Sequence, residues 1–176
     1  EQIRLYNPTD SPQPYYFWNN TAFPETEGTR FIFPMALGTD HDGTGFFRWP
    51  THEGRDLTWL RNYPEPTSVF GFRVDQDFFG AYDVDARYGI VQAADHHLLP
   101  GKKAWTWGTA DEGRVAQAAL TDGDGPYIEV QSGPLRTQSD VAMLMPGQEI
   151  SGQEYWYPVD GFERGFEYAN RYVAVE

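Results

Sequence analysis

A short stretch around residue 130 carries the most informative polar residues of the chain. Glu129 and Gln131 alternate with Ile128 and Val130, so a β-strand would place the carboxylate and the amide on one face. Turn-forming residues bound this segment at 122–126 and 132–134, and Arg136 and Gln138 follow it. Sugar hydroxyls are bound by closely spaced acceptors, donors and bidentate forks. The stretch is therefore a candidate sugar site, and the simpler alternative is a strand face that contacts only water.

A pair of adjacent histidines offers a second kind of chemistry. His96 and His97 follow Asp95 at the end of an apolar segment, and an imidazole there could supply a proton donor and a sugar contact. Adjacent residues of a strand point to opposite faces, so we expect at most one of the two to enter a given site. The alternative is one buried, hydrogen-bonded histidine and one exposed histidine.

Aromatic residues supply two more candidates. Trp105 and Trp107 have the spacing of one strand face, where they would pack in the core or form a platform for the apolar face of a sugar ring. Asp77 precedes Phe78 and Phe79, which would hold its carboxylate in a cleft unless the residue is simply solvated.

Other catalytic and metal-binding signatures are missing from the sequence. There is no cysteine, and we find no phosphate loop, Ser-His-Asp motif or zinc signature. His41 and His52 do not stand at a ligand spacing with a second histidine, which favours a solvated role for both. We therefore predict no metal site and no cofactor.

The elements that must position these residues are strands. The chain has 12 Phe, 11 Tyr and 6 Trp with 18 Gly and 13 Pro, a composition typical of short strands and turns. Apolar segments near residues 3–5 and 15–20 predict an antiparallel pair, and 115–120 is a further extended candidate. Residues 38–66 predict a long, functional loop. The pattern predicts one all-β unit over residues 1–176, a helix-poor antiparallel sandwich.

The net charge narrows the class of partner. Acidic residues outnumber basic ones 26 to 13, giving a net charge of −13, which argues against nucleic acid and anionic membrane as partners. The sequence contains no run of 18 apolar residues, so it predicts no membrane-spanning segment. The chain starts without Met and already in strand-like alternation, so we expect a piece of a larger domain whose partner strands lie upstream.

Several of these segments together resemble a known family. Residues 129–131 (EVQ), 144–147 (LMPG) and 155–157 (YWY) resemble the C-terminal signature of galactose mutarotases, and 100–108 and 18–23 are similar to two further segments of that family. More closely, the start at 5–9 (LYNPT) with 100–108 (PGKKAWTWG) and 127–133 (YIEVQSG) is similar to a bacterial domain family of unassigned function, often joined to tetratricopeptide repeats.

The resemblance implies the C-terminal part of a β-supersandwich with a sugar site, possible association with a tetratricopeptide-repeat region, and roles for particular residues. Glu129 matches the base that takes the anomeric proton, and Asp77 matches a carboxylate that binds sugar hydroxyls. The proton-donating histidine of the family falls at Asn20, and asparagine cannot deliver a proton. The resemblance therefore implies a sugar site but not ordinary mutarotation, unless His96 or His97 substitutes.

Three functions stay open at this point. The first is a module that binds or acts on a mono- or oligosaccharide, with Glu129, His96 and His97 as catalytic candidates and a set of contact residues: Asp77, Gln131, Arg136, Asn20 and Trp107. The second is a glycosidase that pairs Glu129 with Asp77 or Glu154, which requires the two carboxyl groups to lie about 5–5.5 Å apart for retention or about 6.5–9.5 Å apart for inversion. The third is a non-catalytic structural or sugar-binding domain.

Overall fold

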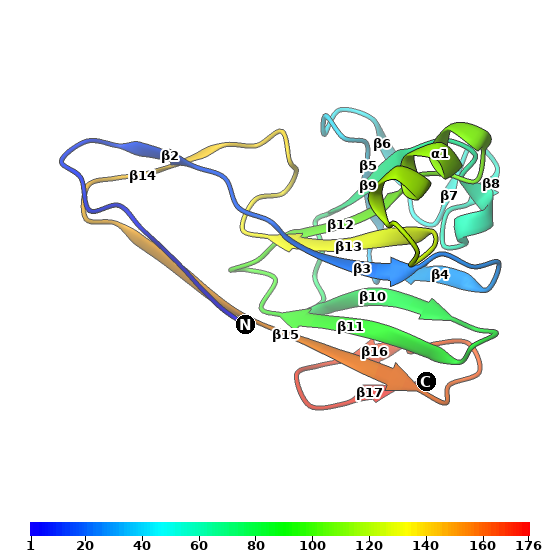
Figure 1. The fold of residues 1–176 in the computed structure, drawn as a ribbon. Helices are drawn as coiled ribbons and strands as arrows, with labels where there is room; N and C mark the ends of the chain where they lie inside the picture. The colour runs from blue at the N-terminus through cyan, green and yellow to red at the C-terminus, as the bar shows by residue number, and fades with distance from the viewer.

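The computed structural model describes residues 1–176, which form two antiparallel sheets packed face to face. The five-stranded sheet has the order β1-β15-β11-β10-β4, with bounds Gln2–Tyr6, Glu149–Asp160, Tyr88–Ala94, Phe78–Asp83 and Thr29–Ile32. The six-stranded sheet has the order β3-β13-β12-β9-β5-β6, with bounds Asn19–Pro24, Tyr127–Gly133, Gly101–Thr106, Thr67–Phe72, Leu37–Thr39 and Phe46–Arg48. Figure 1 shows the two layers stacked one above the other. The predicted all-β sandwich is confirmed.

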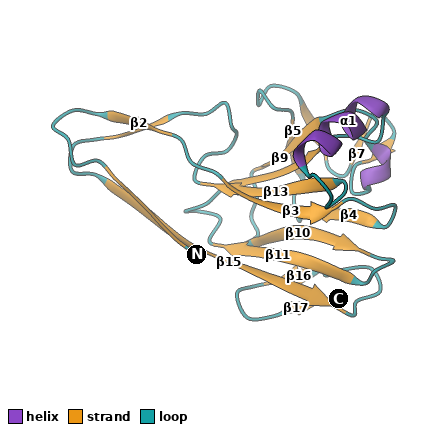
Figure 2. Cartoon of the chain, in the orientation of Figure 1, coloured by secondary structure: helices purple, strands orange, loops and turns teal.

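Three small two-stranded sheets and two helical segments complete the chain. The small sheets are β14 with β2 (Ala142–Leu144, Gln13–Tyr15), β16 with β17 (Tyr168–Ala169, Ala174–Val175) and β7 with β8 (Thr51–His52, Arg55–Asp56). The 3-10 turn η1 spans Leu60–Asn62, and the one α-helix, α1, spans Asp111–Leu120. Figure 2 shows how little of the chain is helical. No helix is both long and apolar enough to span a bilayer.

The two sheets differ in how their faces are covered. The main core lies between them and includes Phe31, Phe79, Val69 and Ile128. The other face of the five-stranded sheet is also covered, because Phe166 and its neighbours in the β16–β17 region pack on Phe78 and Val91; all six residues of β10 are buried. The outer face of the six-stranded sheet is covered only in part, where Trp18 and His41 pack on Phe70, and the open remainder of this face carries the polar residues of interest.

Two local expectations were wrong. The strand at residues 3–5 does not pair with the segment near 15–20: β1 pairs with β15, whereas β2 pairs with β14 and β3 with β13. Residues 115–120 are not extended but belong to α1, whose first turn holds Asp111 and Glu112, where acidic side chains favour a helix N-terminus. The predicted loop at 38–66 also contains β6, which extends the six-stranded sheet by one strand.

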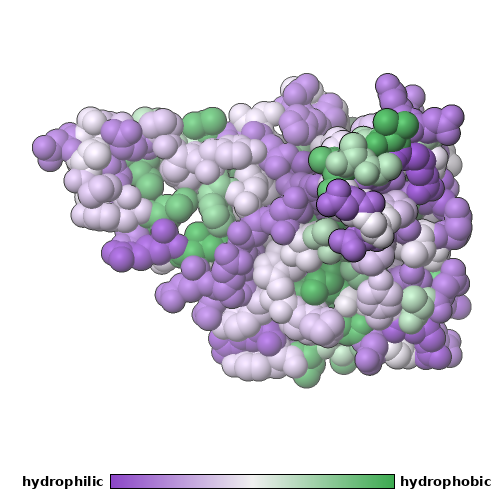
Figure 3. Space-filling model, viewed as in Figure 1, coloured by the Kyte–Doolittle hydropathy of each residue, from purple (hydrophilic) through white to green (hydrophobic).

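An arm projects from the sandwich. It consists of β1 with the first part of β15, and of the β2–β14 ribbon, and Figure 1 shows it reaching well beyond the two sheets. Exposed apolar side chains on it include Tyr6, Met143 and Met145. In Figure 3, green hydrophobic side chains border the space between the arm and the body.

Candidate functional site

The open face of the six-stranded sheet carries a cleft with a volume of about 660 Å³. This volume falls within the usual range for small-molecule sites, about 300–1,000 Å³. Its lining comes from the sheet, from the segment entering β3 and from the loop after β5: Tyr16, Phe17, Trp18, Asn20, His41, Lys103, Trp105, Trp107, Glu129, Gln131 and Gln138.

Strand register explains why these side chains meet. Asn20, Gln131 and Lys103 are direct cross-strand partners on β3, β13 and β12, so they form one row across the sheet. Glu129 and Trp105 are partners in the next row on the same face. Cross-strand partners have Cβ atoms about 4.5–5.5 Å apart, so three strands bring a carboxylate, two amides, an ammonium and an indole together without help from loops.

Hydrogen bonds link the polar groups of the cleft into a chain. Gln131 Nε2 donates to Glu129 Oε2 at 2.6 Å, and Gln138 Nε2 donates to Gln131 Oε1 at 2.8 Å. Lys103 Nζ donates to Gln138 Oε1 at 2.5 Å. One carboxylate oxygen of Glu129 is thereby held in place, while Oε1 accepts no hydrogen bond from the protein and can accept one from a ligand.

Lys103 is the cation of this site. Its side chain is buried, and burial lowers the pKa of its ammonium to about 8, although the nearby Glu129 carboxylate acts in the opposite direction. The Nζ lies 5.2 Å from the centre of the Trp105 ring and 5.4 Å from that of Phe70, so two aromatic faces stabilise its charged form. At neutral pH Lys103 is therefore mostly protonated and also able to release a proton.

His41 enters the cleft from the turn after β5. The Asp40 carboxylate accepts hydrogen bonds from the backbone of Thr44 and Gly45, and these bonds, Gly45 first, lower the pKa of Asp40 and fix the turn. The His41 ring packs edge-on against Phe70, and its Nδ1 lies 3.2 Å from Ser68 Oγ. The one histidine that lines the cleft is thus one for which the sequence favoured a solvated role.

Aromatic side chains form the walls. Trp105 and Trp107 meet edge to face with ring centres 5.2 Å apart, and both line the cleft rather than the core. Trp18 closes another side and packs edge-on against the buried Phe70 at 5.7 Å. Such walls offer flat apolar faces of the kind that stack on sugar rings.

Four predicted site residues do not line this cleft. Arg136 is exposed after the Gly133–Pro134 bend. His96 and His97 lie in the turn after β11, and Asp77 Oδ1 accepts from the backbone and the Nδ1 of His96 at 3.0 and 2.7 Å. Partial burial would raise the pKa of Asp77, but the His96 hydrogen bonds outweigh it and lower that pKa.

The expectation that His96 and His97 point to opposite faces was wrong. It assumed a strand, whereas the backbone amides of Leu98 and Leu99 both donate to the carbonyl of Asp95 in a helix-like turn. The two rings lie on one side with centres 3.9 Å apart.

The second carboxylate required by a glycosidase is also missing from the cleft. Glu154 stands on β15 in the other sheet and is fully buried. Its oxygens accept from Gln92 Nε2 at 2.9 Å and from Asn19 Nδ2. Among the cleft residues, Glu129 is the only carboxylate.

Comparison with known proteins places the chain in a family. The model of the family described as "Domain of unknown function (DUF5107)" matches residues 1–159. The chain belongs to this family. The resemblance seen in the sequence is therefore confirmed.

Solved structures support the same placement for the fold. A TPR-domain containing protein from Parabacteroides distasonis is similar with 32% identity and a TM-score of 0.79, over 91% of this chain and 27% of that one. A galactose mutarotase-like protein from Clostridium acetobutylicum matches with 14% identity and a TM-score of 0.60. The match covers 91% of this chain and 52% of the C. acetobutylicum protein. This DUF5107 chain thus spans about a quarter and about half of these two proteins and shares the mutarotase-like β-sandwich fold.

Sequence reasoning included Gln138 in the candidate stretch but did not find Lys103, His41 and Trp18 as cleft residues. Lys103 had a usable signal, because it stands two residues before Trp105 and therefore on the same strand face. His41, Trp18 and Gln138 come from connecting segments, whose positions depend on the assembled sheet and not on a local pattern.

Proposed function

We propose that the cleft on the six-stranded sheet binds a mono- or oligosaccharide, with Glu129 as hydroxyl acceptor or general base. The observation that carries this proposal is the hydrogen-bonded chain from Glu129 through Gln131 and Gln138 to Lys103, which runs beside the indoles of Trp105 and Trp107. Sugars present hydroxyls around their edge and C–H groups on their faces, so a site that combines polar groups with aromatic faces suits them.

A catalytic version of this site would open a cyclic hemiacetal. Glu129 removes the anomeric hydroxyl proton, the bond from C1 to the ring oxygen breaks, and that oxygen takes a proton from an acid. His96 and His97 do not line the cleft, so the acid in this proposal is Lys103 or His41. The lowered pKa of Lys103, about 8 through burial, suits a proton donor that works near neutral pH.

A non-catalytic sugar-binding domain is the second candidate, favoured by the absence of a histidine at Asn20. A carboxylate-pair glycosidase is the least supported, because neither Asp77 nor Glu154 lines the cleft with Glu129. In the catalytic and in the non-catalytic sugar-binding version, the ligand occupies the same cleft.

A test separates these versions. We expect a panel of aldoses and oligosaccharides to shift amide resonances of cleft residues, and Glu129→Gln to weaken binding about 10-fold or more, since a charge-assisted hydrogen bond is lost. Glu167→Gln, an exposed glutamate outside the cleft, is the matched control. Anomer exchange measured by NMR then decides catalysis: loss of exchange in Glu129→Gln supports a base. A sugar that shifts residues elsewhere contradicts the proposal.

We also infer that the domain works beside a tetratricopeptide-repeat region and the remainder of a larger mutarotase-like domain. The support is the similarity to the P. distasonis protein, which is named for its TPR domain. A longer natural chain that includes both parts is expected to unfold at a higher temperature than residues 1–176, and equal midpoints would argue against this inference.

A further inference from the structure

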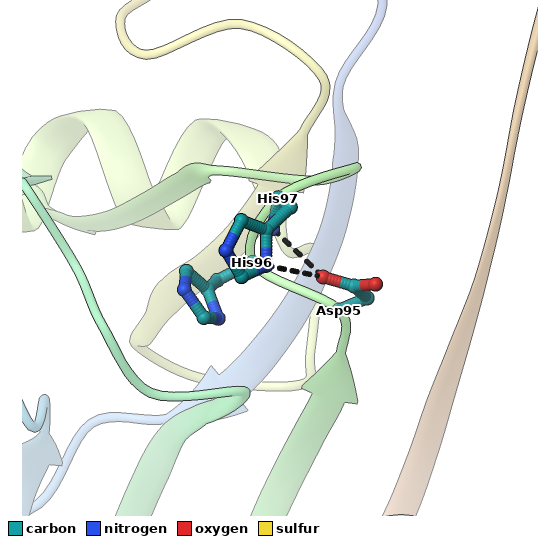
Figure 4. A group of neighbouring side chains, drawn as sticks. All are labelled: Asp95, His96 and His97. Carbon is teal, nitrogen blue, oxygen red and sulfur yellow. Dashed lines mark hydrogen bonds and ion pairs between the residues drawn. The ribbon is translucent and has the colours of Figure 1, made fainter.

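The turn between β11 and β12 gathers three groups that can bind a metal ion. Asp95, His96 and His97 each offer one ligand atom, and these atoms lie within 4.8 Å of one another. Figure 4 shows the two imidazole rings side by side, with Asp95 hydrogen-bonded to His97. This cluster lies outside the cleft described above, so an inference from it is independent of the sugar site.

One imidazole is oriented by a carboxylate outside the ligand set, and the other lies against a carboxylate within it. His96 Nδ1 lies 2.7 Å from Asp77 Oδ1, and His97 Nδ1 lies 3.0 Å from Asp95 Oδ1. For His96, the bond to Asp77 places the proton on Nδ1 and leaves the Nε2 lone pair free, which is how metal-binding histidines are characteristically oriented. For His97, an ion that binds both Nδ1 and Asp95 Oδ1 would replace the proton that these two atoms share.

The backbone holds both carboxylates in place independently of the rings. Asp77 Oδ1 accepts from the His96 amide at 3.0 Å, and Asp95 Oδ1 accepts from the His97 amide at 2.9 Å. The ligand set is therefore largely formed before any ion binds, which reduces the ordering cost of binding.

The spacing suits a small cation after a slight adjustment. A tetrahedral ion with metal–ligand bonds of about 2.0–2.2 Å holds its ligand atoms about 3.3–3.6 Å apart. Ligand atoms that lie within 4.8 Å of one another therefore have to close by at most about 1.5 Å, which rotation of the side chains can supply. Two protonated imidazoles with ring centres 3.9 Å apart would repel each other, whereas two neutral rings sharing one cation would not.

We propose that this turn binds a divalent transition-metal ion such as Zn²⁺. His96 and His97 supply imidazole nitrogens, Asp95 supplies a carboxylate oxygen, and water completes the coordination. Asp77 is a positioning residue that acts through His96. Imidazole ligands favour Zn²⁺, Cu²⁺ or Ni²⁺ over Mg²⁺ and Ca²⁺. His97 and Asp95 are exposed, with 78% and 54% of their side chains accessible, so the ion enters directly from solvent.

Binding of the ion would fix the start of β12. Only Leu98, Leu99 and Pro100 separate His97 from Gly101, the first residue of β12. That strand carries Lys103 and Trp105 into the cleft, so the metal would stabilise the strand on which the cleft is built.

The test is a titration of the metal-free, untagged chain with Zn²⁺ by calorimetry and with Co²⁺ by visible absorption. We expect one ion per chain, released by a chelator. His97→Gln is expected to weaken binding at least 10-fold. Asp77→Asn is expected to weaken it about 10–100-fold, the usual cost of losing such a partner.

His52→Gln is the matched control, because His52 is an exposed histidine in the small β7–β8 sheet, away from this turn. It should bind Zn²⁺ as the unaltered chain does. His97 is exposed, so its variant should fold, and circular dichroism checks this. Equal Zn²⁺ affinity in His97→Gln and His52→Gln, or no Co²⁺ spectral change at millimolar ion, would overturn the proposal.

Discussion

The open cleft and the buried layer between the two sheets contain the same kinds of polar groups in opposite circumstances. The cleft holds Glu129 with glutamines and Lys103, and the buried layer holds Glu154 with Gln92 and Lys102. Lys102 and Lys103 are neighbours on β12, so the alternation of a strand sends one lysine to each region.

The two regions differ in what their polar groups can still bind. In the cleft, the hydrogen-bonded chain leaves Glu129 Oε1 open toward a ligand. In the buried layer, Lys102 Nζ and Gln92 Oε1 have no partner, although Gln92 Nε2 reaches both Glu154 and Ser132. Residue types alone therefore do not distinguish a binding surface from a structural polar core. The strand face on which the residues lie distinguishes them.

Among these variants, removal of the buried glutamate should lower the free energy of unfolding most. Glu154→Ala removes the acceptor of Asn19 and Gln92 and one of the two carboxylates that favour the charged form of Lys102, so we expect a loss of about 3–5 kcal/mol in the free energy of unfolding. Glu129→Ala, in the cleft, should cost less than about 1 kcal/mol. Denaturant unfolding measures both, and equal losses would break the distinction between the two regions.

The second prediction concerns pH and the two lysines. Burial lowers the pKa of Lys102 and of Lys103 to about 8, whereas an unfolded lysine titrates near 10.4. Between these values the unfolded chain binds protons that the folded chain has released, so stability rises with pH. Each lysine then contributes about 2 kcal/mol from pH 8 to pH 10, so we expect the free energy of unfolding to increase by about 4 kcal/mol in total.

Variants assign this rise to its source. Lys102→Met should remove roughly half of it, because one of the two lysines no longer titrates. The measurement is denaturant unfolding at half-unit steps of pH, ending at pH 10 because unfolded tyrosines ionise there. A flat or falling stability between pH 8 and pH 10 would show that these lysines are not desolvated.

The smallest of the predicted changes concerns sugar binding by the aromatic walls of the cleft. Trp105→Ala should weaken sugar binding about 10-fold, because an aromatic contact is worth roughly 0.5–1.5 kcal/mol beyond the buried area. Trp59→Ala is the control, since Trp59 contacts the guanidinium groups of Arg30 and Arg61 outside the cleft. The measurement is calorimetric titration with the best sugar from the panel, and an equal loss in both variants would contradict a stacking role.

The sequence predicted the parts that depend on local alternation. Glu129 and Gln131 do share the face that lines the cleft, because the period of a strand is two whatever it pairs with. The class of fold followed from strand-sized apolar segments and frequent turns. Family resemblance added the mutarotase-like architecture, which no local pattern contains.

Features that depend on distant pairing were not predictable in the same way. The pairing of β1 with β15 joins residues about 150 positions apart, and neighbouring strands in sequence gave a wrong partner. The placement of His41 in the cleft depends on the pairing of β5 with β9. For His96 and His97, the error was local: the apolar strand ends at Ala94, before the histidines.

The arm built from β1 and β15 has a consequence for how this family can vary. Its paired strands lie beyond the sandwich core, and their side chains alternate between two faces. Adding two residues to each strand would lengthen the arm by about 6.8 Å and preserve every face, whereas adding one would invert all residues beyond it. Homologues are therefore expected to differ in arm length by even steps, so that reach can evolve while the cleft stays unchanged.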